Sequence, residues 1–426
     1  MEDGLLGLGG MHAWAIATAA VVSAGCALVG TLLVVRRMSL LGDAISHAVL
    51  PGIVIAVLAG GRPGGVAVVV GAVAAALLTV WLTQSLRLHG GMAEDAGAGV
   101  VFTTMFAAGV LIITAAASRI DLDPSCVLYG ILELVPFDTV LLLGHEVPRA
   151  FVTGTVVLGI LLAAGALTWR QQVFTAFDPA AARAAGVPVG AVTLGLLAAT
   201  ALATVSSFEA VGAILVVAML VVPAATAELL VHRLPWVMVV AVLVAMSSAC
   251  LGYLAAWRFG TSAAGMIAVV LGLQYLAAAV LAPHDGVVSR VVFRLGLAWR
   301  VTCEDCLAAI WRAEEAAADG GVATPFEPTV WQRAALTWLR VIGRVQANAD
   351  TWRLSAQGRS AAETIVRSHR LWEAWLGHHV ELPLDHLHPP AEWVEHHLGA
   401  DVRKRIEAEV GGPESDPHGR TIPPER

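Results

Sequence analysis

Nine apolar runs, each long enough to cross a membrane, constrain the fold of this chain more than any other feature. They lie near residues 11–35, 38–60, 64–85, 95–117, 149–168, 190–208, 211–231, 236–257 and 262–282. A helix of about 20 apolar residues spans the hydrocarbon core and satisfies its backbone polar groups internally. The 426 residues are 57% hydrophobic and 14% charged, which is typical of a polytopic membrane protein. We therefore predict an all-α polytopic membrane protein.

One pair of runs, 190–208 and 211–231, leaves the number of spans open. Ser206, Ser207 and Glu209 interrupt the apolar character between the two runs. The pair could form two short spans, or one span followed by a re-entrant segment. We therefore expect eight or nine transmembrane helices.

The composition changes after residue 284. Trp, His, Glu and Arg become frequent there, and no later apolar run is long enough to cross a membrane. A soluble domain of about 130 residues is within the usual size range. We predict a transmembrane domain over 1–284, a linker over 285–300 and a mainly α-helical domain over 301–426.

The arginines predict the orientation, because cytoplasmic loops carry an excess of Lys and Arg. With the N-terminus outside, one side receives Arg36, Arg37, Arg87, Arg170, Arg183, Arg233 and the arginines after residue 284. The other side receives Arg62, Arg119, Arg149 and Arg258. Nine spans place the C-terminal domain on the arginine-rich, cytoplasmic side, so the bias favours nine over eight.

The net charge of -7 argues against nucleic acid as the main partner of the whole chain.

One polar stretch, RRMSLLGDAISHAVLPG at residues 36–52, stands among the apolar runs. Asp43 and His47 are four residues apart and share one face of a helix. His47 lies about 15 Å along a helix from the leading arginines, near mid-bilayer. Pro51 removes a helix hydrogen bond and Gly52 permits an unusual backbone, as in the broken helices of transporter sites. Charges at that depth are costly, so we interpret the pair as part of a cation path; the alternative is a packed polar pair that ties two helices together.

The segment from Phe177 to Gly186 predicts a short capped helix at the cytoplasmic face. Asp178 can cap this helix, and Pro179 suits its first position. Gly186 can end it. Taken alone, the pattern fits a docking site for a partner and a plain connector between two spans equally well.

Several of these stretches together resemble the metal-type (ABC-3) permeases of ATP-binding-cassette importers for manganese, zinc or iron. The matching stretches are residues 36–52, Glu94-Asp95 with 99–104, IDLDPSCVLYGILELVPFD at 120–138, the FDP…ARAAGVP segment at 177–188, and 211–227. They cover about 15–283 in the expected order. The resemblance implies a bacterial inner-membrane permease. It also implies a second permease copy or related permease, cytoplasmic ATPase subunits and an extracytoplasmic metal-binding protein.

The resemblance also implies roles for individual residues. The family's mid-membrane metal contact falls on Asp43 and His47. The family's ATPase-coupling helix falls on Phe177, Asp178, Pro179, Arg183 and Gly186. This implication favours the docking interpretation of that segment.

Residues from about 301 to 423 resemble a second family, the metal-responsive repressors of the diphtheria-toxin-repressor and manganese-regulator type. The resemblance is carried by WRLSAQGRSAAETIVRSHRLWEAWLGHHVELPLDHLHPPAEWVEHHL and by the tail PESDPHGRTIP. It implies a partial winged helix followed by a helical metal-binding and dimerisation part. The implied metal ligands are His369, Glu373, His388, Glu392, Glu395, His396 and Asp305.

The spacing of these residues supports a metal site independently. His369 and Glu373 are i,i+4 on one helical face, and Glu392, Glu395 and His396 cluster on a second helix. Nitrogen and oxygen ligands of this kind suit Mn²⁺, Fe²⁺ or Zn²⁺. The alternative is an exposed pair of helices rich in His and Glu.

The chain departs from the repressor pattern in two places. Ala308 stands where a carboxylate ligand is expected three residues after Asp305, and Cys303 and Cys306 form a lone CxxC that predicts zinc only weakly. The segment between Glu315 and Trp338 is short for a full helix-turn-helix, which leaves 331–345 as a recognition-like helix. A short motif tethered to a membrane does not favour operator binding.

We therefore predict a permease subunit that imports a divalent metal, with Mn²⁺ or Fe²⁺ favoured and Zn²⁺ possible, and with a cytoplasmic metal-sensing domain. The sequence holds no Walker motif, so ATP hydrolysis is expected in separate subunits and the chain itself is not an enzyme. Two alternatives are a membrane-anchored metal-responsive transcription regulator and a metal exporter or proton-coupled carrier without an ATPase.

Overall fold

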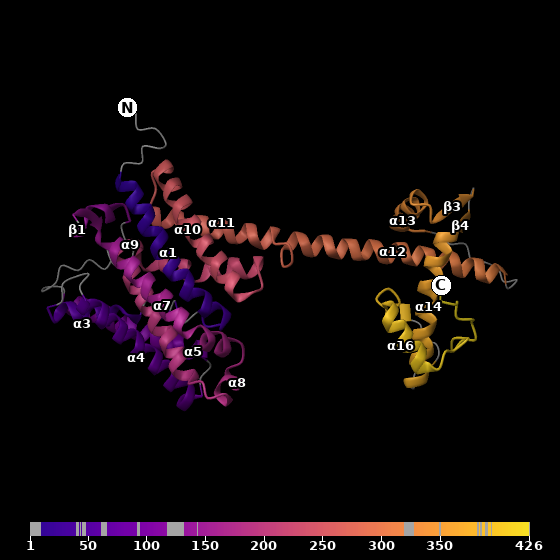
Figure 1. Cartoon of the computed structure of the whole chain (residues 1–426), viewed down its shortest axis with the longest axis horizontal. Helices are drawn as coiled ribbons and strands as arrows, with labels where there is room; N and C mark the ends of the chain where they lie inside the picture. The colour runs from indigo at the N-terminus through magenta and orange to yellow at the C-terminus, as the bar shows by residue number, and fades with distance from the viewer. Residues whose placement is uncertain are drawn as a thin grey trace. The chain divides into compact units, whose positions relative to one another are not determined.

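The computed structural model consists mainly of helices and divides into two compact units, Met1–Ser289 and Arg290–Arg426. The structure describes residues 10–39, 42, 44, 48–60, 66–91, 94–116, 132–142, 144–318, 328–348, 351–380, 383, 386–387, 391–392 and 394–425. Figure 1 labels most of the elements of both units.

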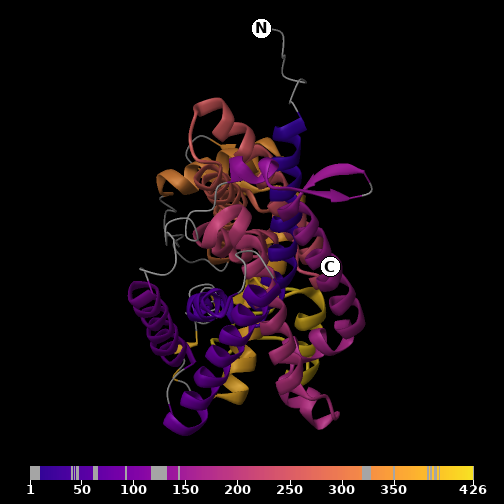
Figure 2. The same ribbon diagram turned by 90° about the vertical axis from the view of Figure 1, so that its left-hand side faces the viewer.

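The first unit is a bundle of helices with one small hairpin. Its elements are α1 (Gly10–Val35), α3 (Leu50–Leu58), α4 (Val66–Gly90), α5 (Glu94–Ala116), the 3₁₀ helix η1 (Leu132–Phe137), β1 (Thr139–Leu142), β2 (His145–Pro148), α7 (Arg149–Phe177), α8 (Pro179–Ala184), α9 (Val189–Leu230), α10 (Leu234–Phe259) and α11 (Ala263–Leu281). The strands β1 and β2 pair antiparallel and form the ribbon that projects from the bundle in Figure 2.

Seven helices in the described part of the chain are long and apolar enough to cross a membrane. They are Gly10–Val35, Ala67–Leu86, Ala96–Ala116, Arg149–Phe177, Val189–Phe208, Leu234–Phe259 and Ala263–Leu281. The other two predicted runs correspond to shorter helices, α3 and Leu215–Leu230. The all-α polytopic architecture is therefore confirmed, while a total of eight or nine spans stays a prediction.

The helix α1 lies at the centre of the bundle, against α7, α9 and α10. A core of buried apolar residues joins these helices, among them Cys26, Leu33, Met219 and Leu220. Gly30 is required for this packing, because a Cβ there would lie 1.9 Å from the backbone oxygen of Leu220 in α9. Small residues at helix contacts allow such close approach in membranes.

The helix α9 is interrupted at Gly212, whose φ of 75° and ψ of 161° are not helical. A positive φ of this kind is open to glycine and costly for other residues. The serines that seemed from the sequence to break the run do not break it, because their hydroxyls donate to the helix itself. Both Ser206 and Ser207 bond the backbone oxygen of Ala203. The break therefore lies a few residues later than expected.

The second unit contains the C-terminal elements and begins within α12 (Val287–Ala318). They are α13 (Val330–Val341), β3 (Val345–Asn348), β4 (Thr351–Leu354), α14 (Ala356–His379) and α16 (Ala400–Val410). The helix α13 followed by the antiparallel β3–β4 hairpin is the observed part of a winged helix. Most of the residues expected to form a linker, 285–300, belong to α12.

A small core holds the winged-helix part to the rest of the unit. Cys306, Leu307 and Ile310 of α12 pack against Leu336 and Leu339 of α13. The burial of this apolar surface fixes the side of α12 that faces inward. The helix α14 packs against α12 through Ala362, Ile365 and Val366, and it also pairs with α12 through charged residues.

Candidate metal centre

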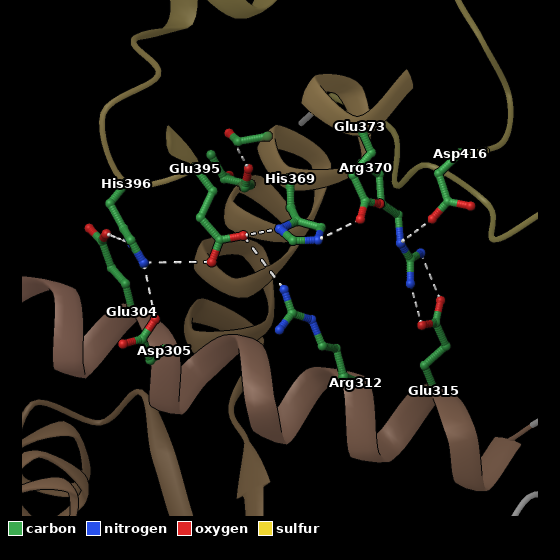
Figure 3. A network of polar contacts seen from close by, with 12 residues as sticks. Glu304, Asp305, Arg312, Glu315, His369, Arg370, Glu373, Glu395, His396 and Asp416 are labelled. Carbon is green, nitrogen blue, oxygen red and sulfur yellow. Dashed lines mark hydrogen bonds and ion pairs between the residues drawn. The ribbon is translucent and has the colours of Figure 1, made fainter. Parts of the chain in front are cut away.

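The predicted metal ligands of the second unit converge where α12 meets α14 and the segment after Ala391 (Figure 3). Asp305 comes from α12, and Glu395 and His396 come from the turn before α16. One ligand atom from each of these three residues lies within 4.8 Å of the others. We call this set the first cluster.

His396 is held by carboxylates at both ring nitrogens. Its Nε2 lies 3.0 Å from Asp305 Oδ1 and 3.6 Å from Glu395 Oε1. Its Nδ1 lies 2.7 Å from Glu304 Oε2 on the other side of the ring. Metal-binding histidines are commonly oriented by a carboxylate in this way, because it sets the tautomer and the ring angle.

His369 connects the first cluster to Glu373. Its Nδ1 lies 2.6 Å from Glu395 Oε2, and its Nε2 lies 3.2 Å from Glu373 Oε1. Both His369 and Glu373 belong to α14, one helical turn apart, as their spacing predicts. Their side chains are almost fully buried, with exposed fractions of 4% and 3%.

The first cluster opens into a cavity of about 760 Å³ in the second unit. Glu392, a predicted ligand, lines this cavity together with Asp305, Glu395 and His396. The Asp305 side chain is 48% exposed, so the cluster is reachable from the solvent.

Negative charge dominates this region and raises the pKa of both histidines. For His369, burial lowers the pKa, but hydrogen bonds to Glu373 and Glu395 outweigh it and the net shift is upward. For His396, burial also lowers the pKa, and Asp305 and Glu304 reverse this and raise it to about 9. Arg312 Nη2, 3.5 Å from Glu395 Oε2, contributes one compensating positive charge.

The first cluster fits a divalent transition metal. It offers one imidazole nitrogen and two carboxylates, and nitrogen and oxygen donors are those chosen by Mn²⁺, Fe²⁺ and Zn²⁺. The buried carboxylate of Glu395 needs a positive partner, which a cation or the protonated histidines can supply.

Two departures from the repressor pattern have structural reasons. Ala308 is buried against Ile365 and Val366, so that position of α12 faces the core and not the cluster. Cys306 is also in the core, and burial, then Cys303 and Asp305, raise the pKa of its thiol to about 12. The thiol therefore stays protonated, which disfavours zinc binding there.

Sequence reasoning missed three residues near the predicted ligands. Glu304 orients His396, and Arg312 faces Glu395. Asp416, in the C-terminal tail, lies close to Arg370 of α14. Glu304 could have been found from its place beside Asp305, whereas Asp416 reaches α14 only through the fold. The predicted ligand His388 lies outside the described residues.

The predicted transport pair of the first unit, Asp43 and His47, also lies outside the described residues. Pro51 lies in the first turn of α3, a position that suits proline. Gly52, however, is helical, and the expectation of an unusual backbone is wrong. A glycine is needed at position 52 for packing, because a Cβ there would lie 2.1 Å from the backbone oxygen of Gly71 in α4.

The predicted coupling segment forms the short helix α8 between α7 and α9. Asp178 Oδ1 accepts hydrogen bonds from the backbone nitrogens of Ala180 and Ala181, at 3.0 and 2.8 Å. Gly186 follows the helix with a φ of 81°, as a helix-ending glycine does. Phe177 is 70% exposed beside the cap. The capped helix is confirmed, and its coupling role stays a prediction.

Both parts of the chain match profiles of known protein families. Residues 10–282 match the profile of the ABC 3 transport family, and residues 355–424 match that of the iron dependent repressor, metal binding and dimerisation domain. The chain is 38% identical over 289 residues to the manganese transport system membrane protein MntD of Bacillus subtilis (strain 168), covering 67% of this chain and 97% of the relative.

Two further proteins are similar to the first part. The zinc transport system membrane protein TroD of Treponema pallidum (strain Nichols) is 36% identical over 273 residues, covering 64% of this chain and 74% of the relative. The solved structure of PsaBC from Streptococcus pneumoniae in complex with Fab superposes with a TM-score of 0.57 at 28% identity, covering 66% of this chain and 95% of that chain. The profile matches most of the chain, and seven helices among its described residues are long and apolar enough to cross a membrane; this chain belongs to the ABC 3 transport family.

Proposed function

We propose that this chain is the permease subunit of an ABC importer that moves a divalent transition metal ion across the bacterial inner membrane. The membership of residues 10–282 in the ABC 3 transport family carries this proposal. The relatives named above transport manganese and zinc, and we favour Mn²⁺ or Fe²⁺ because the fused domain resembles an iron dependent repressor.

We place the cargo in a path that contains Asp43 and His47. The support is their sequence pattern, in which a carboxylate and an imidazole share one helical face near mid-bilayer. The test is uptake of Mn²⁺ into proteoliposomes that contain the full transporter. Asp43→Ala and His47→Ala should abolish uptake, while His89→Ala, which changes an exposed histidine at the end of α4, should retain it. Normal uptake by both path variants would exclude this path.

The proposed partners are two cytoplasmic ATPase subunits, an extracytoplasmic metal-binding protein and a second permease subunit. The chain presents α8 with the exposed Phe177 as the docking element for an ATPase. Removal of an N-cap costs about 1 kcal/mol, so Asp178→Ala should loosen α8 and lower metal-driven ATP hydrolysis. Asp178→Ser keeps a capping oxygen and should retain most of the activity. Equal ATP hydrolysis by both variants and the wild type would exclude this coupling role.

We further propose that the second unit is a cytoplasmic metal sensor that slows transport when metal is plentiful. The supporting observation is the first cluster, whose three ligand atoms lie within 4.8 Å and face a solvent-accessible cavity. Binding of metal there would stabilise one state of the domain, and such coupling must act in both directions.

The sensor proposal is tested by raising Mn²⁺ on the cytoplasmic side of the proteoliposomes. Uptake by the wild type should fall as this concentration rises, and His396→Ala should shift the inhibition to higher metal. His378→Ala, an exposed histidine on α14 outside the cluster, serves as the matched control. Superimposable inhibition curves for His396→Ala and the wild type would exclude a sensor role for the cluster.

A second candidate function, a membrane-anchored transcription regulator, is favoured by the surface of α13. Arg333, Arg340 and Arg344 are exposed on or after this helix, and the β3–β4 hairpin follows it as a wing. Phosphate contacts by arginine would make DNA binding fall steeply with salt. Binding of duplex DNA by the full chain that is lost in Arg340→Ala would support this function, and absence of binding at low salt would exclude it.

A further inference from the structure

The C-terminal tail of the second unit, residues 413–423, is folded tightly onto α14. The tail closes on itself through the backbone bonds Asp416 N to Arg420 O and Ile422 N to Glu414 O, each 2.9 Å. Arg370 of α14 donates to the carbonyl of Thr421 at 2.5 Å. Ile422 joins a buried apolar cluster with residues of α14 and α16. The tail is therefore a built part of the domain with a defined position.

This fold of the tail brings two potential metal ligands to Glu373. A ligand atom from each of Glu373, Asp416 and His418 lies within 4.8 Å of the others. His418 Nδ1 is 3.8 Å from Glu373 Oε2, the oxygen that does not face His369. Figure 3 shows the Glu373 and Asp416 side chains on opposite sides of Arg370.

The position of the tail is set by packing as well as by hydrogen bonds. Asp416 Oδ1 accepts from the backbone nitrogens of His418 and Arg420, at 2.9 and 2.8 Å. Pro417 rests on α14 at Gly377, where a Cβ would lie 3.2 Å from the proline ring. These contacts hold the loop over Glu373 without using the His418 ring, so the ring stays available for a ligand.

Two buried carboxylates, two imidazoles and one guanidinium lie close together in and around this group. Glu373 and Asp416 are 2% and 6% exposed, and Arg370 is the guanidinium beside Asp416, with Nε 3.6 Å from Asp416 Oδ2. Arg370 is already engaged by the carboxylate of Glu315, with nitrogen–oxygen distances of 2.9 and 2.5 Å. Arg370 therefore faces two carboxylates, while Glu373 pairs with the rings of His369 and His418. Buried carboxylates require compensating positive charge, which a divalent cation supplies.

We propose that Glu373, Asp416 and His418 form a second site for a divalent transition metal, distinct from the first cluster. The site offers two carboxylates and one imidazole, a donor set suited to Mn²⁺ and Fe²⁺. Two of its three ligands come from the tail, so metal binding fastens the tail to α14. This site deepens the sensing part of the proposed function and rests on that proposal for its biological role, while its existence rests on the tail geometry.

The two metal sites are joined by one buried imidazole. His369 lies between Glu395 of the first cluster and Glu373 of the second site, at 2.6 and 3.2 Å. Metal in either site changes the charge on the carboxylate that faces this ring. We therefore expect the occupancy of one site to alter the affinity of the other, with equal effects in both directions.

The test is Mn²⁺ binding by the purified full-length protein, measured by equilibrium dialysis with elemental analysis. His418→Gln and Asp416→Asn should each bind one equivalent fewer than the wild type. Asp416→Asn keeps the oxygen that accepts the backbone hydrogen bonds, so the loop should stay folded. His396→Gln should lose a different equivalent, and the double variant His396→Gln/His418→Gln should lose both. His378→Gln should bind as much as the wild type.

A second measurement reports on the tail itself. Mn²⁺ should slow hydrogen exchange of the backbone amides of 413–423 in the wild type and in His396→Gln, but not in His418→Gln. Unchanged exchange of α14 in all variants shows that the domain is folded. The proposal is overturned if His418→Gln and Asp416→Asn both keep the full metal content. It is also overturned if Mn²⁺ leaves the hydrogen-exchange rates of the tail amides unchanged in the wild type. Neither result depends on transport, so failure of the importer proposal would be seen separately.

Discussion

His396 is the only imidazole of the first cluster, and its protonation state governs whether the cluster can bind a metal ion. Three carboxylates face the His396 ring: those of Glu304 and Asp305 in α12 and that of the adjacent residue Glu395. These three carboxylates favour the protonated ring in the absence of metal. A metal ion requires the neutral ring, so protons and metal compete for the same nitrogen.

This competition predicts a pH dependence with a definite sign. The raised pKa of about 9 means that protonation of His396 stabilises the metal-free domain fully below the ordinary value of 6.5, and this stabilisation is lost as pH rises through 9. Mn²⁺ binding should therefore strengthen over the same interval and release protons. Calorimetric titrations in buffers of different ionisation enthalpy measure both effects, and His396→Gln should remove the proton release at this site. Equal affinity at both ends of the interval would contradict the assignment.

Arg370 is a second residue whose environment predicts a large effect. Its side chain is 3% exposed, and it pairs with Glu315, Asp416 and the carbonyl of Thr421. Arg370→Ala would leave the buried carboxylate of Asp416 without its ion-pair partner and would break the contacts with Glu315 and Thr421, at a cost of about 3–5 kcal/mol. The free energy of local opening, from hydrogen exchange of α14, measures this loss.

The matched control for Arg370 is Arg359 on the same helix. Arg359 pairs with Glu314 of α12, but its side chain is 45% exposed. Exposed ion pairs contribute about 0–1 kcal/mol because water and salt screen them. Arg359→Ala should therefore change the opening free energy of α14 only slightly. Similar losses for the two variants would show that burial does not govern these pairs.

At the scale of elements, the contact between α1 and α9 depends on Gly30. The backbone oxygen of Leu220 occupies the space that a Cβ would need, and a backbone atom cannot rotate away. Gly30→Ala should separate the helices and lower stability by about 1–3 kcal/mol, seen as a lower thermal midpoint in detergent. Gly159→Ala on α7, where no atom lies within 4 Å of the new Cβ, should keep the wild-type midpoint. A wild-type midpoint for Gly30→Ala would contradict a close contact between α1 and α9 at Gly30.

The winged-helix elements show how a predicted element can differ in extent from the observed one. The sequence indicated a helix over 331–345, but α13 ends at Val341 and Val345 begins β3. Thr329 and Gln332 form a capping box that defines the start of the helix. Gly343, with a φ of 74°, turns the chain into the hairpin.

At the scale of the whole molecule, the arginine bias predicts the placement of the C-terminal domain. With the N-terminus outside and nine spans, this domain is cytoplasmic. A green fluorescent protein fused to the C-terminus should fluoresce, and alkaline phosphatase fused there should be inactive. Phosphatase inserted after Gly144, at the tip of the β1–β2 hairpin, should be active because this segment is predicted outside. Active phosphatase at the C-terminus would favour eight spans.

The chain's sequence was sufficient to predict the all-α membrane architecture, the capped helix α8 and the shared helical face of His369 and Glu373. These features depend on local patterns: apolar length, capping residues and i,i+4 spacing. The grouping of Asp305 with Glu395 and His396 was implied only by the resemblance to a known family, because these residues are far apart in the sequence. A helical period places side chains on a face wherever the helix lies. Such patterns can therefore be read before the fold is known.

The tertiary structure decided the features that join distant segments. Ala308 is a core residue because of what α14 places against it, and Gly52 is required because α4 approaches it at Gly71. The tail ligands Asp416 and His418 reach Glu373 only after the chain has folded back over α14. Contacts between separate elements leave no periodic signal, because their geometry is set by packing and not by the local backbone.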